Sequence, residues 1–260
     1  MMEIPKIIHY CWFGGNPLPA SAKKCRASWR KYLPDYEIKE WNESNFNINS
    51  IPYTAEAYQA KKYAFVSDYA RFWILYKYGG LYFDTDVEII KNMDDIIAKG
   101  AFMGCENKSL KGKSASSLGV APGLGLGTFP NHTFYGEILQ IYENMKFILD
   151  NGVINNENIV TTTTKLLCYK GLQNIDGIQL IDGIYIYPKE YFCPKDYSTG
   201  RLDITHNTRS IHHYDASWLP WYVIAEHKFC YKLHIPCHDL LNKLFYTKTF
   251  LKDLKKKINI

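Results

Sequence analysis

The chain has 260 residues and a formal net charge of +5, and 47% of its residues are apolar and 15% aromatic. This composition excludes an intrinsically disordered protein, and no apolar run is long enough to cross a bilayer as a helix. The seven cysteines, an odd number, form no C-x-x-C pair, which argues against a disulfide framework and against a cysteine-based zinc site.

The N-terminal region predicts a strand, a helix and a second strand. The run IPKIIHYCWFG is typical of a strand and ends at a turn over 14–17, before a helix predicted over 21–33 and a strand over 36–41. This order of elements predicts a parallel sheet. Because Lys6 and His9 interrupt the first apolar run, it resembles neither a signal peptide nor an anchor, and we expect a soluble cytoplasmic protein.

One long helix is predicted over 55–78, with Thr54 as its cap and Gly79 and Gly80 at its end. Aromatic residues recur along it at spacings of four, three and four residues. They predict a buried stripe made of Phe65, Tyr69, Phe72 and Tyr76.

The same helix carries an acid and a base beside this stripe. Asp68 and Arg71 lie three residues apart, so their side chains share a helix face, along with Lys61. An ordinary helix ion pair is one interpretation, and a pair of binding residues is the other.

A strand is predicted over 81–90, and it contains Asp84, Asp86 and Glu88. Residues two apart lie on one face of a strand, so these carboxylates converge. Neighbouring carboxylates repel each other unless a cation neutralises them, and oxygen ligands favour Mg²⁺ or Mn²⁺. Taken alone, D-x-D is also compatible with a strand end that faces water.

Further helices and strands are predicted along the rest of the chain. They are a helix over 94–98, a strand over 101–106, helices over 134–149 and 160–168, strands with glycine turns within 177–194, and a β-run over 208–218. No internal repeat or linker is visible. We therefore predict a single α/β domain over 1–239, followed by a tail over 240–260.

The tail carries six lysines against one acid, Asp253, and so accounts for the whole net charge. The remaining chain is formally neutral, which argues against a nucleic-acid-binding protein. Apolar residues in the tail are spaced for one helix face, which indicates a basic amphipathic helix on an anionic membrane surface. A terminal helix packed on the domain is the alternative.

The segment SDYARFWILYKYGGLYFDTD, residues 67–86, resembles the signature of the DXD sugar-binding glycosyltransferases. These are glycosyltransferase family 32 and its relatives, which include the clostridial glucosylating toxins and the yeast initiating mannosyltransferases. The shared pattern is Ser-Asp, an arginine three residues after the aspartate, an aliphatic stretch, Gly-Gly, an aromatic residue and D-x-D. The blocks IPKIIHYCWFGG and SIHHYDASW resemble the first strand and the closing motif of bacterial members.

This resemblance implies a GT-A fold, a Rossmann-like mixed sheet flanked by helices, and retention of anomeric configuration. It implies that Trp12 stacks on the nucleotide base, Asp68 accepts hydrogen bonds from sugar hydroxyls, and Arg71 orients the sugar or a phosphate. Asp84 then contacts the ribose or sugar and reaches the metal through water, while Asp86 coordinates the metal directly. A core tryptophan is the alternative for Trp12.

The closing motif contains two adjacent histidines, which point to opposite faces of a regular strand. The resemblance implies that one of them, with His212 preferred over His213, completes the metal shell, and that Ser217 and Trp218 close over the diphosphate. The glycine-rich segment APGLGLGTFPNH, residues 121–132, has no dinucleotide-binding fingerprint, so we expect a flexible loop on the acceptor side.

Two residues of that loop, Asn131 and His132, are candidates to line the acceptor side. Many family members carry Gly-Pro ahead of the helix that corresponds to 160–168, whereas this chain has NENIVTTTTKLL, and no role is carried over there.

The combined interpretation is a metal-dependent retaining glycosyltransferase that uses Mn²⁺ or Mg²⁺ and a nucleotide-sugar, with a UDP-sugar preferred. Its acceptor is a glycan or a lipid-linked oligosaccharide in capsular or other surface polysaccharide synthesis. The expected location is the cytoplasm, with the tail on the inner face of the plasma membrane as an option. The alternatives are a metal-dependent nucleotide phosphohydrolase and a non-catalytic basic peripheral membrane protein.

Overall fold

The computed structural model describes residues 3–155, 157–215 and 221–237. The chain divides into two compact units, the first made of 1–194 and 204–213 and the second of 195–203 and the chain from 214 onward. The tail over 240–260 lies outside the described residues, so the domain boundary before it stays a prediction. No helix in the described residues has the length and apolar character that a membrane span requires.

A seven-stranded mixed sheet forms the centre of the first unit, in the order β2-β1-β3-β6-β5-β8-β7. The strands are β1 (Ile7–Cys11), β2 (Glu37–Trp41), β3 (Gly80–Tyr82), β5 (Phe102–Gly104), β6 (Leu126–Thr128), β7 (Gln179–Ile181) and β8 (Ile184–Tyr187). β1 pairs in parallel with β2 and β3, and β5 pairs in parallel with β8, whereas β6 and β7 run antiparallel to their neighbours. The predicted parallel opening is therefore confirmed.

A second, two-stranded sheet joins β4 (Val87–Ile89) to β9 (Ser210–His212) in the antiparallel sense. The helices of the first unit are α1 (Ala20–Tyr32), α2 (Pro52–Gln59), α3 (Tyr63–Tyr78), α4 (Asp94–Ile97), α5 (Thr133–Glu143), α6 (Ile159–Tyr169) and α7 (Lys189–Phe192). Short 3-10 turns are η1 (Ile48–Ser50), η2 (Ala115–Leu118) and η3 (Pro122–Leu124).

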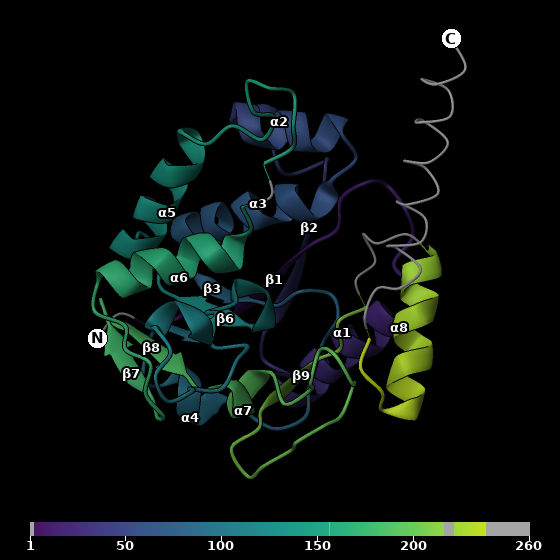
Figure 1. Ribbon diagram of the computed structural model, residues 1–260. Helices are drawn as coiled ribbons and strands as arrows, with labels where there is room; N and C mark the ends of the chain where they lie inside the picture. The colour runs from purple at the N-terminus through teal and green to yellow at the C-terminus, as the bar shows by residue number, and fades with distance from the viewer. Residues whose placement is uncertain (1–2, 156, 216–220, 238–260) are drawn as a thin grey trace. The chain divides into compact units, whose positions relative to one another are not determined.

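Helices cover both faces of the large sheet. α3 contacts β1, β3 and β6, and it packs against α2 and α5 in one layer (Figure 1). On β1 the side chains alternate: the Tyr10 ring lies 5.7 Å from the Trp29 ring of α1, whereas Cys11 joins the core that α3 covers. The predicted fold class, a mixed α/β sheet flanked by helices, is confirmed.

The turn from α3 into β3 requires glycine at two successive positions. Gly79 and Gly80 have φ angles of 64° and 97°, in the left-handed region. A Cβ at Gly79 would lie 2.7 Å from Pro130 Cδ, and one at Gly80 would lie 2.6 Å from the Ile7 carbonyl oxygen. The Gly-Gly pair therefore lets the helix end directly against β1.

A buried histidine holds this turn in place. Trp41 Nε1 donates to His9 Nδ1 at 3.0 Å, so the proton lies on Nε2, which donates to the Gly79 carbonyl at 3.0 Å. Burial lowers the pKa of His9 to about 4, with a small contribution from Lys39. The ring is therefore neutral at physiological pH and has a structural role.

The prediction of one helix over 55–78 is wrong, because the chain breaks between α2 and α3. Lys61 has a φ of 56° and ends the first helix. The break lets the buried face of α2, which includes Tyr53 and Ala57, pack on α3. Thr54 is not a cap, since its hydroxyl lies inside α2 and donates to the Ile48 carbonyl at 2.6 Å.

The second unit contains α8 (Trp221–Leu233) and the loop over 195–203. The Tyr231 hydroxyl of α8 donates to the Tyr197 carbonyl at 2.7 Å. Gly200 has a φ of 67°, and a Cβ there would lie 2.6 Å from Tyr231 Cγ. A glycine at this position therefore allows the loop to pack directly on the helix.

Candidate functional site

Asp84 and Asp86 lie in the turn between β3 and β4, where the Val87 N–H donates to the Asp84 carbonyl at 3.0 Å. The prediction of one strand over 81–90 is therefore wrong. The chain must turn because β3 belongs to the large sheet, whereas β4 pairs with β9. The turn follows the carboxyl end of β3, the edge at which open α/β sheets bind ligands.

Two carboxylates and one imidazole converge at this turn. Ligand atoms of Asp84, Asp86 and His212 all lie within 4.8 Å of one another. The pairing of β4 with β9 sets His212 opposite Val87, and its Nε2 lies 3.2 Å from Asp86 Oδ1. Segments more than a hundred residues apart in the sequence thus form one candidate metal site.

The donor set of this site fits Mn²⁺ or Mg²⁺. Carboxylate oxygens suit both ions, and an imidazole nitrogen shifts the preference toward Mn²⁺. Burial acts to lower the pKa of His212, but the nearby carboxylates of Asp86, Asp84 and Glu106 outweigh it, so the pKa is raised. The surplus negative charge that causes this shift is also what attracts a cation.

His213 lies on the opposite side of β9 and takes no part in the cluster. Its Nε2 lies 2.8 Å from Glu88 Oε2, and Lys24 Nζ of α1 lies 3.2 Å from Glu88 Oε1. Burial acts to raise the pKa of Glu88, but the hydrogen bonds from His213 and Lys24 and the charge of Lys24 outweigh it, so the pKa is lowered. The expectation that Glu88 shares a face with the two aspartates is therefore wrong, because β4 starts only after the turn.

Asp68 and Arg71 reach the same site from α3. Arg71 Nη2 lies 2.9 Å from Asp68 Oδ1 and 3.4 Å from Asp84 Oδ1, and Nη1 donates to Asp84 Oδ2 at 3.4 Å. The Tyr82 hydroxyl donates to Asp84 Oδ1 at 3.2 Å. The Arg71 side chain is only 5% exposed, so this contact is a buried cluster and not a surface ion pair of the helix.

When Asp68 and Asp84 are both ionised, this buried cluster has two negative charges and only one positive charge, that of Arg71. Burial raises the pKa of Asp68 to about 6, although Arg71 acts in the opposite direction. Burial also raises the pKa of Asp84, and Asp86 adds to this, against the effects of Arg71 and His212. A metal ion or donating hydroxyl groups of a ligand would stabilise both ionised carboxylates.

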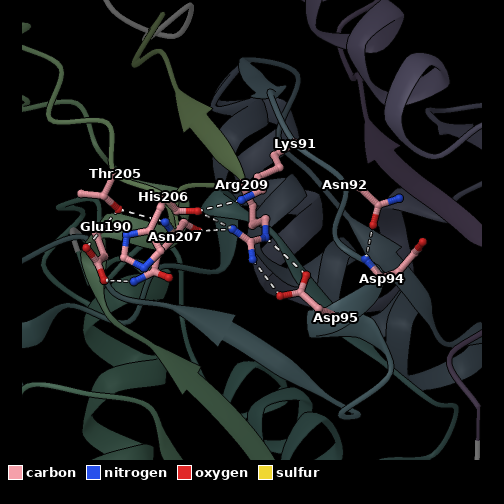
Figure 2. Close-up of polar contacts among 9 residues, drawn as sticks. All are labelled: Lys91, Asn92, Asp94, Asp95, Glu190, Thr205, His206, Asn207 and Arg209. Atoms are coloured by element: carbon pink, nitrogen blue, oxygen red, sulfur yellow. Dashed lines mark hydrogen bonds and ion pairs between the residues drawn. The ribbon is translucent and has the colours of Figure 1, made fainter.

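The strand that carries His212 is held by a network around Arg209, shown in Figure 2. Arg209 Nη2 lies 2.7 Å from Asp95 Oδ2, and its Nη1 donates to the carbonyls of His206 and Asn207 at 3.2 and 2.7 Å. The Lys91 ammonium also donates to the His206 carbonyl, at 2.9 Å. Arg209 thereby ties the start of β9 to the chain around α4, and the position of His212 follows from that of β9.

Gly123, in η3, lies directly against the acidic turn. Its carbonyl accepts a hydrogen bond from the Asp84 N–H at 3.3 Å. A Cβ at this position would lie 2.2 Å from Asp84 Oδ2 and 3.3 Å from Arg71 Nη1. Since Arg71 and Tyr82 hold the Asp84 carboxylate, any side chain at Gly123 must displace a carboxylate of the candidate metal site.

We expect Gly123→Ala to lower Mn²⁺ affinity by about 10- to 100-fold, because displaced metal-site geometry typically costs this much. Gly136→Ala is the matched control, since Gly136 lies in α5 with a Tyr76 side-chain carbon 3.2 Å from the added Cβ. Calorimetric titration of Mn²⁺ into the purified variants measures both. Equal Mn²⁺ affinity in Gly123→Ala and the wild type would show that the Asp84 carboxylate takes no part in metal binding.

The expectation of a flexible glycine-rich loop is wrong over 122–128. Alternate glycines make room for neighbouring side chains: a Cβ at Gly125 would lie 2.8 Å from the Phe83 ring, and one at Gly127 would lie 2.5 Å from the Phe102 ring. This segment forms η3 and β6, and it is buried. The two-residue spacing of the glycines was the signal in the sequence that could have indicated a strand against bulky neighbours.

Asn131 and His132 lie at the other end of β6 from the site. The antiparallel pairing sets Gly80 opposite Thr128 and Tyr82 opposite Leu126, so the chain after Thr128 runs away from the acidic turn. His132 is buried, and burial lowers its pKa. These two residues therefore do not line the site, contrary to the expectation from the sequence.

The remaining predicted site residues are Trp12, Ser217 and Trp218. Trp12 follows the carboxyl end of β1, beside β3, and its partly exposed ring donates from Nε1 to the Asn16 carbonyl at 2.5 Å. Ser217 and Trp218 lie outside the described residues, and their roles stay predictions. The structure therefore brings Asp68, Arg71, Asp84, Asp86 and His212 into one site.

Comparisons with known proteins agree with the resemblance of the 67–86 segment. Residues 19–103 match the family model described as the glycosyltransferase sugar-binding region containing a DXD motif. Inositol phosphoceramide mannosyltransferase 3 of Schizosaccharomyces pombe is 31% identical over 146 residues, which cover 55% of this chain and 37% of that protein. The family model that matches is therefore the one that the 67–86 segment resembles.

A further relative is an uncharacterised glycosyltransferase of Acanthamoeba polyphaga mimivirus, 31% identical over 169 residues that cover 63% of this chain and 62% of that protein. The chain thus spans less than two thirds of the length of either relative. Among solved structures, the PaToxG glycosyltransferase has a TM-score of 0.49 at 18% identity and covers 65% of this chain and 71% of its own. The galactosyltransferase LgtC has a TM-score of 0.41 at 11% identity, with 88% and 95% covered.

Proposed function

Since residues 19–103 belong to the DXD-containing sugar-binding region of glycosyltransferases, we propose that this protein is a metal-dependent retaining glycosyltransferase. It moves a sugar from a nucleotide-sugar, a UDP-sugar, to a glycan acceptor in capsular or other surface polysaccharide synthesis. The observation that carries this proposal is the convergence of Asp84, Asp86 and His212 beside the buried Arg71–Asp68 pair.

The donor-side residues bind and orient the nucleotide-sugar. Trp12 stacks on the base at the carboxyl edge of the sheet. The Asp68 carboxylate accepts hydrogen bonds from sugar hydroxyls, and the Arg71 guanidinium, held by two carboxylates, orients the sugar or a phosphate. Because Arg71 is fixed by its three partners, little side-chain entropy is lost when the donor binds.

The metal-side residues hold charge where the leaving group departs. When bound, Mn²⁺ or Mg²⁺ supplies the positive charge that neutralises the departing diphosphate. Asp86 and His212 would hold the ion directly, and Asp84 would reach it through water. Ser217 and Trp218 would close over the diphosphate, and no nucleophilic side chain is required.

Metal-dependent hydrolysis of nucleotides is the less favoured function. Such enzymes commonly use two metal ions and correspondingly more carboxylates. In the described part of the chain, the group of candidate metal ligands is a single one with two carboxylates and one histidine. The composition of this site therefore favours the transferase.

The acceptor and the location are also part of the proposal. One relative is named an inositol phosphoceramide mannosyltransferase, which supports a lipid-linked acceptor such as a lipid-linked oligosaccharide. The protein works in the cytoplasm, where the lysine-rich segment 240–260 brings it to the anionic inner face of the plasma membrane.

We expect a UDP-sugar to raise the melting temperature only when Mn²⁺ is present. A ligand at one hundred times its Kd adds about 2.7 kcal/mol of stability, which for a domain of this size corresponds to roughly 5–10 °C. Thermal unfolding is followed with a panel of nucleotide-sugars, with Mn²⁺ or with EDTA. If no nucleotide-sugar gives a Mn²⁺-dependent rise, the proposed function is refuted.

A further inference from the structure

A cavity of about 300 Å³ lies between α6 and the chain that follows β5. Ligand pockets in proteins begin at about this volume, so the cavity has room for one small molecule. The polar side chains that line it include those of Glu106, Asn107, Ser117, Asn158, Thr161 and Lys165. Val160 is its one aliphatic lining residue among those described, so the lining suits a ligand rich in hydrogen-bonding groups.

The two walls of the cavity are tied to each other by hydrogen bonds. On one wall, the Glu106 N–H donates to the Gly119 carbonyl at 2.8 Å. The next residue of that strand-like segment, Val120, donates its N–H to the Thr164 hydroxyl of α6 at 2.9 Å. On the α6 wall, the Asn158 side chain accepts from the Thr161 N–H at 2.9 Å. The cavity is therefore preorganised by the fold.

Gly119 makes the space that two of the polar side chains occupy. It has a φ of 59°, and a Cβ there would lie 2.9 Å from Glu106 Oε1 and 3.0 Å from Asn107 Nδ2. The glycine backbone thus supports the carboxylate and the amide from behind. Glu106, Asn107 and Gly119 all line the cavity, so both groups lie at its wall.

Glu106 is the one carboxylate residue in the lining of the cavity as described. In the described residues, no hydrogen bond or ion pair reaches its two oxygens. Burial raises its pKa, against the effects of His212 and Lys189. A partly buried carboxylate without donors is costly, and a ligand that donates hydrogen bonds to it removes this cost.

The charges around the cavity select among ligands. An anion is disfavoured, because Glu106 repels it and the Lys165 ammonium is already paired with Glu157 at 2.6 Å. A metal ion is disfavoured, because Glu106 stands outside the group formed by Asp84, Asp86 and His212. Neutral hydroxyl groups fit best, since they donate to a carboxylate and also accept from amides and hydroxyls.

One chain segment connects the cavity to the candidate metal site: Gly119 lines the cavity, and four residues later the Gly123 carbonyl accepts a hydrogen bond from the Asp84 N–H at 3.3 Å. The segment over 119–123 therefore borders both the cavity and the acidic turn. This proximity links the cavity to the proposed reaction.

We propose that the cavity is a subsite for one sugar ring, in which a ring hydroxyl donates to the Glu106 carboxylate. The proposal rests on the proposed glycosyltransferase function. Hydroxyl and amide groups of Ser117, Thr161 and Asn107 bind the other ring hydroxyls. An acceptor sugar and the sugar of the donor carry the same kind of ring hydroxyl groups, so either ring fits the subsite. Separate measurements of sugar binding and of the KM for the donor distinguish the two.

The test uses Glu106→Gln and Thr161→Val, which change opposite walls of the cavity without a change of side-chain size. The control is Glu137→Gln, because Glu137 of α5 pairs with Lys170 and neither residue belongs to the cavity lining as described. Affinity for UDP with Mn²⁺ is measured by calorimetry, and binding of methyl glucoside, methyl galactoside and methyl mannoside by saturation-transfer NMR. Hydrolysis of UDP-glucose and UDP-galactose gives the KM for the donor.

Both cavity variants are expected to bind UDP with Mn²⁺ as the wild type does. Glu106→Gln is expected to lower the affinity for the sugar by about 10- to 100-fold. The loss for Thr161→Val is smaller because its hydroxyl is uncharged. An acceptor ring is assigned if the loss is in methyl glycoside binding. A donor ring is assigned if the KM for the UDP-sugar rises instead.

Three outcomes overturn the subsite. They are an absence of any sugar effect in Glu106→Gln, an equal loss of UDP–Mn²⁺ affinity, and an absence of methyl glycoside binding and of UDP-sugar turnover in the wild type. Failure of the proposed function is a different result, namely no Mn²⁺-dependent binding of UDP by the wild type. The NMR measurement needs neither donor nor metal, so it tests the cavity even then.

Discussion

Replacing Asp86 with asparagine is expected to lower metal-dependent sugar transfer by about a thousandfold, because the metal ion supplies several kcal/mol of stabilisation to the leaving group. Asp86 Oδ1 lies 3.2 Å from His212 Nε2, and both residues belong to the candidate metal cluster with Asp84. Asparagine keeps the shape of the side chain and removes its charge. Repulsion from Asp84 also disappears, so we expect the metal-free variant to stay folded.

The control for this variant is Glu88→Gln, two residues along the chain. Glu88 pairs with His213 and Lys24 on the other side of β4, so its neutral replacement should leave Mn²⁺ affinity close to that of the wild type. Calorimetry gives the Mn²⁺ affinity, and chromatography of UDP released from a UDP-sugar gives the turnover. Full Mn²⁺-dependent turnover in Asp86→Asn would rule out the site.

Replacing Arg71 with alanine is expected to remove donor use and also to destabilise the protein by about 3–5 kcal/mol. Arg71 is the cation between Asp68 and Asp84, and its Nε donates to the Ser67 carbonyl at 3.1 Å. Without it, two buried carboxylates lie close together with no compensating charge. Chemical denaturation measures the free energy of unfolding, and donor binding with Mn²⁺ is measured separately.

The destabilisation of Arg71→Ala should depend on pH. Burial raises the pKa of Asp68 to about 6, above its ordinary value of 3.8. Between these pH values the folded state binds more protons than the unfolded state, so the stability from this group falls as pH rises through the window. Loss of Arg71 moves the folded pKa further up. In metal-free buffer, the variant should therefore lose more stability at about pH 8 than at about pH 5.

One further variant separates the charge of Arg71 from its geometry, and another serves as a control at Lys170. Arg71→Lys keeps the charge but loses the two-pronged contact with Asp84, so it should recover much of the stability and little of the donor binding. Lys170→Ala removes a cation that also contacts two carboxylates, Glu137 and Asp182, at a more exposed position, and it should change stability little. A stable Arg71→Ala protein that binds the donor would contradict both roles.

Local signals in the sequence predicted much of the site, because its residues lie on consecutive elements. Asp68 and Arg71 share one helix, Gly79 and Gly80 end it, and Asp84 follows one strand later. The chain therefore brings these groups together with a single reversal. The signature was informative because each of its positions has a local structural role.

Other parts of the site were missed because no local pattern contains them. Gly123 is required by the side chain of Asp84, and Gly119 by the side chain of Glu106, and both contacts exist only after the strands have paired. The helix over 55–78 and the strand over 81–90 were predicted without interruption for a related reason. Their apolar patterns continue across Lys61 and Asp84, whereas packing of α2 and pairing of β4 decide where the chain turns.

The sequence by itself determined the α/β class, the parallel opening and the signature region with its D-x-D, since hydrophobic period, turn residues and residue spacing are all local properties. Only the tertiary structure decided that His212, and not His213, faces the two aspartates, and that Glu88 faces away from them. The physical reason is that strand register and sheet membership depend on partners far away in the chain. The side on which a charge lies is decided by that pairing and not by the residues next to it.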